Sequence, residues 1–176
     1  MEENTPSIST LHDLMDYDAR RFTIAEVQLS MSLEEWTAKA GSLQLKNVLQ
    51  KYLDFVKQHL QKSEAFFEAE QISSFSTSNR IMKAFIEETE EKMNVCSDQE
   101  VKDACLLAAV QSINHFKISV YGTAAAYAQA LGMEKEAAVF HEAGINEKQI
   151  DDRLSQLAEY EINRKARTPI VLPSNN

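Results

Sequence analysis

Six polar or charged side chains fall near the middle of four long helical stretches, where an apolar stripe would be expected. They are Glu26, Asp54, Lys57, Asn114, Lys117 and Glu147. Burying an ionised group costs on the order of several kcal/mol unless another group compensates it. Carboxylates at mid-length of a four-helix bundle hold metal ions, whereas a protonated lysine has no lone pair with which to ligate one. We therefore predict a shared polar core layer, whose chemistry depends on whether it still holds a metal.

The four histidines are not expected to complete a metal site. At about 100° per residue, His59 lies roughly opposite Lys57 on its helix. His115 and His141 lie to the side of the inward faces of their helices, and His12 precedes the first long helix. Each histidine is therefore predicted to be a surface or packing residue.

The segments that position this layer have the apolar spacing of amphipathic helices. The spacing predicts helices over about residues 18–40, 42–71, 99–131 and 134–165, and a shorter helix over 80–93. Gly41 and Gly132 follow two of them in the position of a helix-ending glycine. Tight turns make the first and last pairs antiparallel hairpins. Two hairpins joined by one long crossover with a short extra helix predict an all-α, ferritin-like four-helix bundle.

Length and composition are consistent with one globular domain. The 176 residues include only four Gly and three Pro, which favours an all-α structure. We expect a flexible N-terminus at 1–9, a bundle over 10–167 and a loose tail at 168–176. The net charge of −9 argues against binding to nucleic acid or to anionic membranes. Without a membrane-spanning run, a signal peptide or a disulfide framework, a cytoplasmic protein is expected.

Four segments carry a resemblance to a known family: AEVQL at 25–29, LKNVLQKYLD at 45–54, EVKDACLLAAVQ at 100–111 and HFKISVYGTAAAYAQALG at 115–132. They are similar to the stress-associated ferritin-like proteins of the YciE/YciF type. The resemblance covers about residues 10–166 and is strongest in the last of these segments. It implies a ferritin-like bundle that is often dimeric.

The resemblance also implies a metal site that this chain has altered. The family's first helix offers a glutamate, which Glu26 matches, and its last helix keeps an acid, which Glu147 matches. Its second helix offers a Glu-x-x-His pair. At the matching positions this chain has Asp54 and Lys57, so a shorter carboxylate remains and the imidazole is missing.

The third helix departs further from the family pattern. The family usually offers a glutamate where this chain has Asn114, and an acid one turn later where it has Lys117. A dimetal site of this class typically uses four carboxylates and two imidazoles to balance two divalent ions. The layer here has three carboxylates and two ammonium groups. We therefore expect Lys57 and Lys117 to fill the space of the metal ions and to supply their positive charge, with no cofactor bound.

A second apolar strip lies opposite the core face of the first predicted hairpin. It consists of Ile24, Val27, Met31, Val48 and Phe55. Because a strip shared by neighbouring helices marks an interface, a homodimer through this face is expected, in agreement with the resemblance. The alternative is that the short helix at 80–93 packs over the strip.

These patterns together favour a non-enzymatic, stress-associated ferritin-like protein in which an ion-pair network replaces the dimetal centre. The alternative is an iron- or manganese-binding oxidase or iron-handling protein that uses Glu26, Asp54 and Glu147 as ligands. A third hypothesis is a helical adaptor that uses the apolar strip to bind a different protein. The sequence indicates neither the physiological role nor the identity of a partner.

Overall fold

The computed structural model describes residues 7–69 and 78–167, and these residues contain helices but no strand. The helices are α1 (Leu11–Lys39), α2 (Leu43–Ala69), α3 (Arg80–Val95), α4 (Gln99–Ala130), α5 (Glu134–Leu157) and α6 (Asn163–Ala166), with a π-helical turn η1 (Ala158–Ile162) between the last two. The all-α prediction is confirmed. The expectations for residues 1–6 and 168–176 lie outside the described residues.

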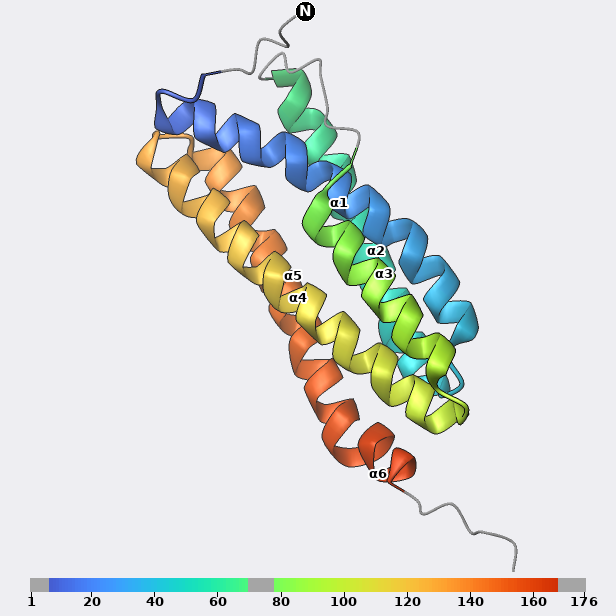
Figure 1. The fold of residues 1–176 in the computed structure, drawn as a ribbon. Coiled ribbons are helices and arrows are strands. Elements are labelled where there is room, and N and C mark those ends of the chain that lie inside the picture. Colours follow the sequence, from blue (N-terminus) through green and yellow to red (C-terminus); the bar gives the residue numbers. More distant parts are fainter. Residues whose placement is uncertain (1–6, 70–77, 168–176) are drawn as a thin grey trace, which may run out of the picture.

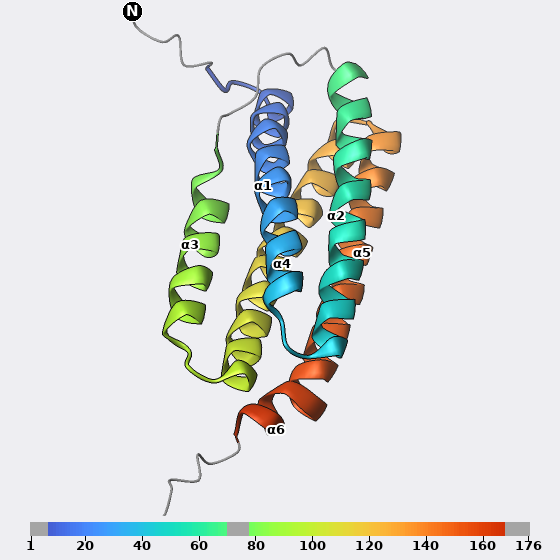
Figure 2. The ribbon, with the colours of Figure 1, turned by 90° about the vertical axis from the view of Figure 1, so that its right-hand side faces the viewer.

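Helices α1, α2, α4 and α5 form the bundle (Figure 1), and α3 lies on its outside (Figure 2). Helices α1 and α2 are antiparallel neighbours, as are α4 and α5, while α3 runs back beside α1 and α4 (Figure 2). Consequently α2 and α4 point in the same direction. The predicted arrangement of two hairpins with one crossover containing a short helix is confirmed. No described helix combines the length and the apolar character needed to cross a membrane.

Side-chain caps explain where three of the helices begin. The Thr10 hydroxyl accepts a hydrogen bond from the Asp13 amide, and the Asp13 carboxylate accepts one from the Thr10 amide. Asn79 and Asp98 cap α3 and α4 by accepting bonds from first-turn amides. The predicted start of the first helix near residue 18 was wrong, because the capping box begins α1 at Leu11.

The two glycines that follow helices act in different ways. Gly132 has φ of 73°, the left-handed conformation expected of a helix-ending glycine. Gly41 does not, and among the described residues Gly132 is the only glycine with positive φ. A Cβ at Gly41 would lie 2.6 Å from Cγ of Gln99, so any side chain at this position would require Gln99 to move. The amides of Gly41 and Ser42 donate to the Asp103 carboxylate at 2.8 and 2.7 Å, which fastens the α1–α2 turn to α4.

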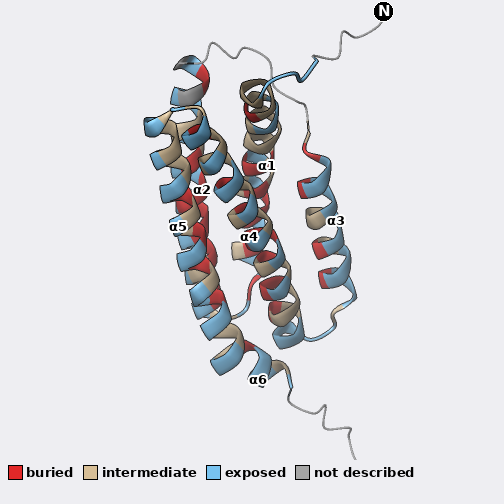
Figure 3. Ribbon diagram, turned by 90° about the vertical axis from the view of Figure 1, so that its left-hand side faces the viewer, coloured by how far each residue is buried: buried red, intermediate tan, exposed pale blue. Residues whose placement is uncertain are grey.

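The described residues form a core of two apolar clusters of unequal size, and buried faces line the bundle interior along its length (Figure 3). The larger cluster lies toward the α1–α2 turn and contains fully buried Leu33, Trp36 and Leu45. The smaller one lies toward the α4–α5 turn and is built on Met15 and Phe67, together with Ala128. Burial of this apolar surface is the main stabilising contribution.

The apolar strip predicted across α1 and α2 is wrong as a continuous surface. Phe55 is buried and its ring stacks on His59 at 6.4 Å, while Val48 packs partly buried against the larger cluster. The same side of α2 carries Lys62, which pairs with Glu142 of α5 at 2.7 Å. This side of α2 therefore faces α5 and does not continue the strip on α1.

The α1 part of the strip remains partly open to solvent. Val27 and Met31 are 39% and 65% exposed, and Ile24 is half-buried. Helix α3 leaves Val27 and Met31 uncovered, and it packs beside α1 and α4 with Phe85 and Ile86 against the larger cluster. The homodimer stays a prediction, with a smaller apolar surface to support it.

Candidate functional site

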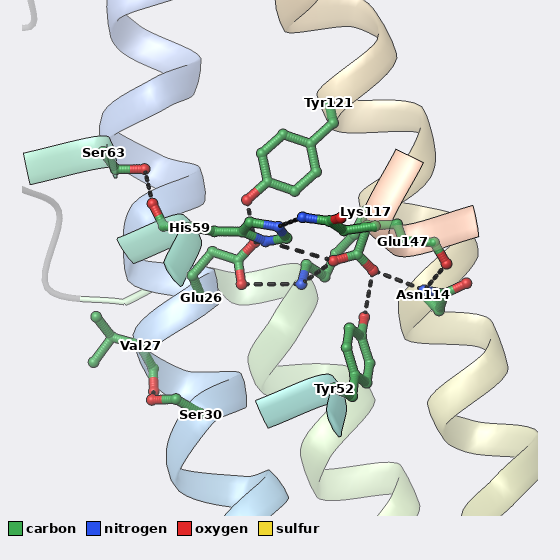
Figure 4. A network of polar contacts seen from close by, with 11 residues as sticks. Glu26, Val27, Ser30, Tyr52, His59, Ser63, Asn114, Lys117, Tyr121 and Glu147 are labelled. Atoms are coloured by element: carbon green, nitrogen blue, oxygen red, sulfur yellow. Dashed lines mark hydrogen bonds and ion pairs between the residues drawn. The ribbon is translucent and has the colours of Figure 1, made fainter. Parts of the chain in front are cut away.

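Seven buried side chains from four helices meet near the middle of the bundle and form the polar cluster (Figure 4). Its members are Glu26 of α1, Tyr52 and His59 of α2, Asn114, Lys117 and Tyr121 of α4, and Glu147 of α5, and none is more than 4% exposed. Three of them follow an i, i+3, i+7 spacing on α4, which places them along one helix face. The cluster therefore connects all four bundle helices.

Lys117 lies at the centre of the polar cluster. Its Nζ is 3.0 Å from Oε2 of Glu26 and 2.6 Å from Oε1 of Glu147. The same Nζ lies 4.7 Å from the centroid of the Tyr52 ring, within the range of a cation–π contact. One ammonium group thus offsets two carboxylates and links α4 to both α1 and α5.

The remaining carboxylate oxygens accept hydrogen bonds. The Tyr121 hydroxyl donates to Oε1 of Glu26 at 2.6 Å. The Tyr52 hydroxyl and the Asn114 amide both donate to Oε2 of Glu147 at 2.7 Å, and the same amide donates to the Glu147 backbone carbonyl at 3.0 Å. Each of the four carboxylate oxygens therefore has either a cation or a donor beside it, as buried charges require.

Burial and mutual charge set the protonation states of the cluster. Burial raises the pKa of Glu26. The Lys117 ammonium acts to lower this pKa and the Glu147 carboxylate to raise it further, and the pKa remains raised. Burial by itself lowers the pKa of Lys117, but the charges of Glu147 and Glu26 outweigh it and leave that pKa raised. Burial and then the carboxylates raise the pKa of Tyr52 and of Tyr121 well above the usual value. At neutral pH the lysine is therefore charged and both phenols keep their protons.

His59 belongs to the cluster as a neutral imidazole. Its Nδ1 lies 3.9 Å from Oε1 of Glu26 and 3.7 Å from Oε1 of Glu147, too long for hydrogen bonds. Its Nε2 lies 3.4 Å from the Asn146 amide nitrogen. Burial, followed by the charge of Lys117, lowers the pKa of His59 to about 3. The prediction that His59 is not an inward residue near the site was wrong.

Four of the six predicted members of the layer do come together: Glu26, Asn114, Lys117 and Glu147. The other two do not. Asp54 is exposed and accepts a hydrogen bond from Gln50 on the same face of α2. The Lys57 side chain is 53% exposed, and its Nζ pairs with Oε1 of Glu34 at 2.9 Å. Asp54 and Lys57 therefore belong to the solvent face and not to the polar core layer.

The error on α2 was one of helical phase. Leu53 and Leu60, which frame Lys57 in the sequence, lie to one side of the buried face. The centre of that face contains Tyr52 and His59, seven residues and therefore about two turns apart. The opposite placement of His59 and Lys57 was correct, but the inward residue of the two is His59. The sequence signal for the inward face of α2 was that Tyr52 and His59 lie in the same helical phase as Leu45 and Leu49.

The donor set does not fit a pair of metal ions. Ligand atoms of Glu26, His59 and Glu147 lie within 4.8 Å of one another, close enough to surround one cation. A dimetal site typically uses four carboxylates, and the described cluster brings two. The Lys117 ammonium already lies against both of them, with three donors and no lone pair. The predicted ligand set that included Asp54 is not assembled, because Asp54 lies on the solvent face.

Comparisons with known proteins agree with the fold and with the resemblance noted in the sequence. A family model described as a domain of unknown function, DUF892, matches residues 10–167. Protein YciF of Escherichia coli strain K12 is 28% identical over 161 residues, which cover 91% of this chain and 97% of YciF. The crystal structure of the E. coli stress protein YciF matches with a TM-score of 0.82 at 27% identity, covering 92% of this chain and all of that chain.

A second solved structure, YcfI from Rhodopseudomonas palustris, shares the fold. It matches with a TM-score of 0.81 at 23% identity and covers 86% of this chain and 96% of that chain. The helical bundle is therefore common to several proteins with limited sequence identity.

Proposed function

The chain belongs to the DUF892 family, and from that premise we propose that it is a stress-associated, ferritin-like protein without enzymatic activity. In this proposal the polar cluster is a structural ion-pair network that replaces a dimetal centre. The similarity to the E. coli stress protein YciF over nearly the whole chain supports the stress association. The observation that carries the rest is the Lys117 ammonium between Glu26 and Glu147. A cytoplasmic location and a homodimer remain part of the proposal.

The chemistry of the cluster supports a structural role. General acid–base catalysis needs a group that reaches a substrate proton, but the carboxylate oxygens of Glu26 and Glu147 are already paired. A nucleophilic lysine needs a lowered pKa, and the pKa of Lys117 is raised. No member of the cluster is more than 4% exposed. The cluster is closed to solvent and one ammonium group offsets both carboxylates, which favours a structural role over one that receives a substrate.

The proposed structural task is to set the relative positions of the helices. Lys117 connects α4 to α1 and α5, and Tyr52 connects α2 to Glu147 on α5. A buried ion pair contributes little net stability compared with apolar packing, but misalignment of any one helix would leave a buried charge unpaired. Such a network disfavours alternative registers of the four helices.

The test compares the wild type with Lys117→Met and Lys57→Met, each purified from cells supplied with iron and manganese. We expect the wild type to contain far less than one ion per chain by elemental analysis, and to remain folded after chelation. We expect Lys117→Met to be strongly destabilised and Lys57→Met to behave like the wild type. A stoichiometric ion that is lost on Glu26→Ala would overturn the proposal.

One observation favours a second candidate, a protein that binds a single iron or manganese ion. Glu26, His59 and Glu147 come from three helices, and their ligand atoms converge within 4.8 Å. This function requires the Lys117 side chain to leave its position between the carboxylates. Retained metal in the wild type, lost on both Glu26→Ala and His59→Ala, would favour this candidate.

A further inference from the structure

The half of the bundle nearer the α4–α5 turn contains a cavity beside the polar cluster. It has a volume of about 260 Å³ and lies between α1 and α4. Six aromatic side chains contribute to its described lining: Phe22, Phe67, Phe116, Tyr121, Tyr127 and Phe140. A second cavity of about 170 Å³ lies on the α2–α5 side and shares Ser63, Tyr121 and Phe140 with the first. The first cavity is the larger of the two and the more aromatic.

Small side chains leave this space open. Ala19 of α1 and Ala124 of α4 line the first cavity, and Ala128 is the buried residue one turn further along α4. At the other end of the bundle the corresponding interior is filled by large residues such as Trp36 and Leu33. The space is open to solvent where exposed Ile81, Ser119 and Thr123 border it. An apolar molecule bound there would remove the apolar lining from water and gain packing contacts with the aromatic rings.

The aromatic rings are arranged to receive a flat molecule. Phe22 meets Tyr121 edge to face at 5.0 Å and Phe116 at 6.2 Å, so ring faces and edges both border the space. The Tyr121 hydroxyl is already committed to Glu26, so this residue offers its ring to a ligand. Aromatic pairs prefer offset or edge-to-face contacts with centroids about 4.5–7 Å apart, which a ring placed here can form.

The polar groups of the lining disfavour a charged ligand. Asp18 and Arg21 bring opposite charges, so either ligand charge would meet a repelling group. Asn79 is already used, because it donates to the Arg21 carbonyl and accepts from the Ile81 and Met82 amides. The Thr23 and Ser63 hydroxyls donate to backbone carbonyls, so the uncharged hydroxyls of Ser119 and Thr123 at the exposed edge add to recognition by shape and apolar contact.

We propose that the cavity between α1 and α4 is a binding site for a small, uncharged aromatic molecule of about two fused rings. The size follows from volume, because an apolar cavity of ~150 Å³ accommodates benzene and this one is about 260 Å³. The site is separate from the ion-pair network, which it touches only through the Tyr121 ring.

The probe is indole, which is uncharged and has two fused rings, with indole-3-acetate as its charged counterpart. Titration calorimetry on the full chain is expected to show one indole per chain, and binding of indole-3-acetate at least about tenfold weaker. Absence of saturable indole binding, or equal affinity for the two compounds, would overturn the proposal.

Filling the cavity provides the matched variants. Ala124→Phe and Ala19→Phe place a ring in the space and are each expected to weaken indole binding at least about tenfold. Ala126→Phe makes the same change at an exposed position of α4 and is expected to bind indole like the wild type. Wild-type affinity in both filling variants would place indole elsewhere and refute the assignment.

A measurement on the wild type makes the test independent of variant folding. Nuclear Overhauser contacts between indole protons and the side chains of Val120 and Phe116, which line the cavity, are expected in the complex. Contacts only with residues outside the lining would contradict the proposal even if the filling variants do not fold.

Discussion

The Nζ of Lys117 lies 2.6 Å from Oε1 of Glu147, and neither side chain is exposed to solvent. The pair joins α4 to α5 at a depth where an unpaired charge would be costly. The second carboxylate, Glu26, lies 3.0 Å from the same ammonium group. The stability of the bundle is therefore expected to depend on Lys117 far more than on any lysine of the surface.

Lys117→Met is expected to lower the free energy of unfolding by ~3–5 kcal/mol, because two buried carboxylates lose their counter-charge. Lys57→Met is the matched control. It removes an exposed pair with Glu34, and such pairs contribute about 0–1 kcal/mol. Urea unfolding followed by circular dichroism measures both. Equal losses in the two variants would mean that Lys117 is not held as an ion pair.

Tyr121→Phe and Tyr52→Phe each remove a hydroxyl that donates to a buried carboxylate. Hydrogen bonds to charged groups are typically worth about 1.5–3 kcal/mol, so a loss of that size is expected for each variant. Tyr160→Phe, at a residue 62% exposed, is the control and is expected to leave stability unchanged. If thermal and urea unfolding do not distinguish the buried variants from this control, the hydrogen bonds contribute nothing net.

Because His59 is buried with a lowered pKa, the free energy of unfolding is expected to depend on pH. Its folded-state pKa is about 3 against the usual 6.5, so below 6.5 the unfolded chain binds a proton that the folded chain refuses. The free energy of unfolding therefore falls as the pH drops from about 6.5 toward 3. Glu147, Glu26 and Lys117 face the imidazole, and Lys62 lies on the same helix.

Glu26 contributes to the pH dependence of stability with the opposite sign. Because its folded-state pKa is raised above 4.5, its contribution to stability is lost as the pH rises from about 4.5 through that raised value. His59→Phe is expected to flatten the acid limb of a stability profile measured between pH 3 and 7. A profile identical to that of the wild type would show that another group controls this range.

Lys117→His is expected to convert the cluster into a site for one divalent ion. It removes the repelling ammonium and adds an imidazole beside Glu26, His59 and Glu147. Cobalt absorption spectra and elemental analysis should show about one ion per chain. The double variant Lys117→His, His59→Phe is expected to bind more weakly. A Lys117→His protein that binds no ion would show that the carboxylates are held by other contacts.

Helix positions were largely predictable because they depend on local spacing and on caps. The interval between apolar residues predicted α2, α3 and α4 closely, and Gly132 marked the end of α4. The helix predicted over 134–165 begins where α5 does, but α5 ends at Leu157, where the π-helical turn η1 follows it. The start of α1 was missed because the signal was the reciprocal pair of Thr10 and Asp13 and not the apolar stripe. The two residues of this cap are visible in the sequence, but they are equally compatible with a short turn that precedes the helix.

The inward-facing residues of the polar cluster were predicted correctly on three helices and wrongly on α2. Glu26, Lys117 and Glu147 lie at the centre of stripes whose phase is clear from the sequence. Helix α2 is apolar over a wider arc, so two phases were compatible with its leucines. The sequence could not show how α2 is rotated against α5. The Tyr52–Glu147 and Lys62–Glu142 contacts join the two helices with His59 inward and Lys57 outward.

The sequence by itself determined an all-α bundle of two hairpins and the members that α1, α4 and α5 contribute to a polar layer at mid-length. Only the tertiary structure decided that one lysine, Lys117, and not two, lies among the carboxylates. The physical reason is that burial depends on how each helix is rotated against its neighbours. That rotation follows from packing between distant segments, which the local pattern of a single helix does not contain.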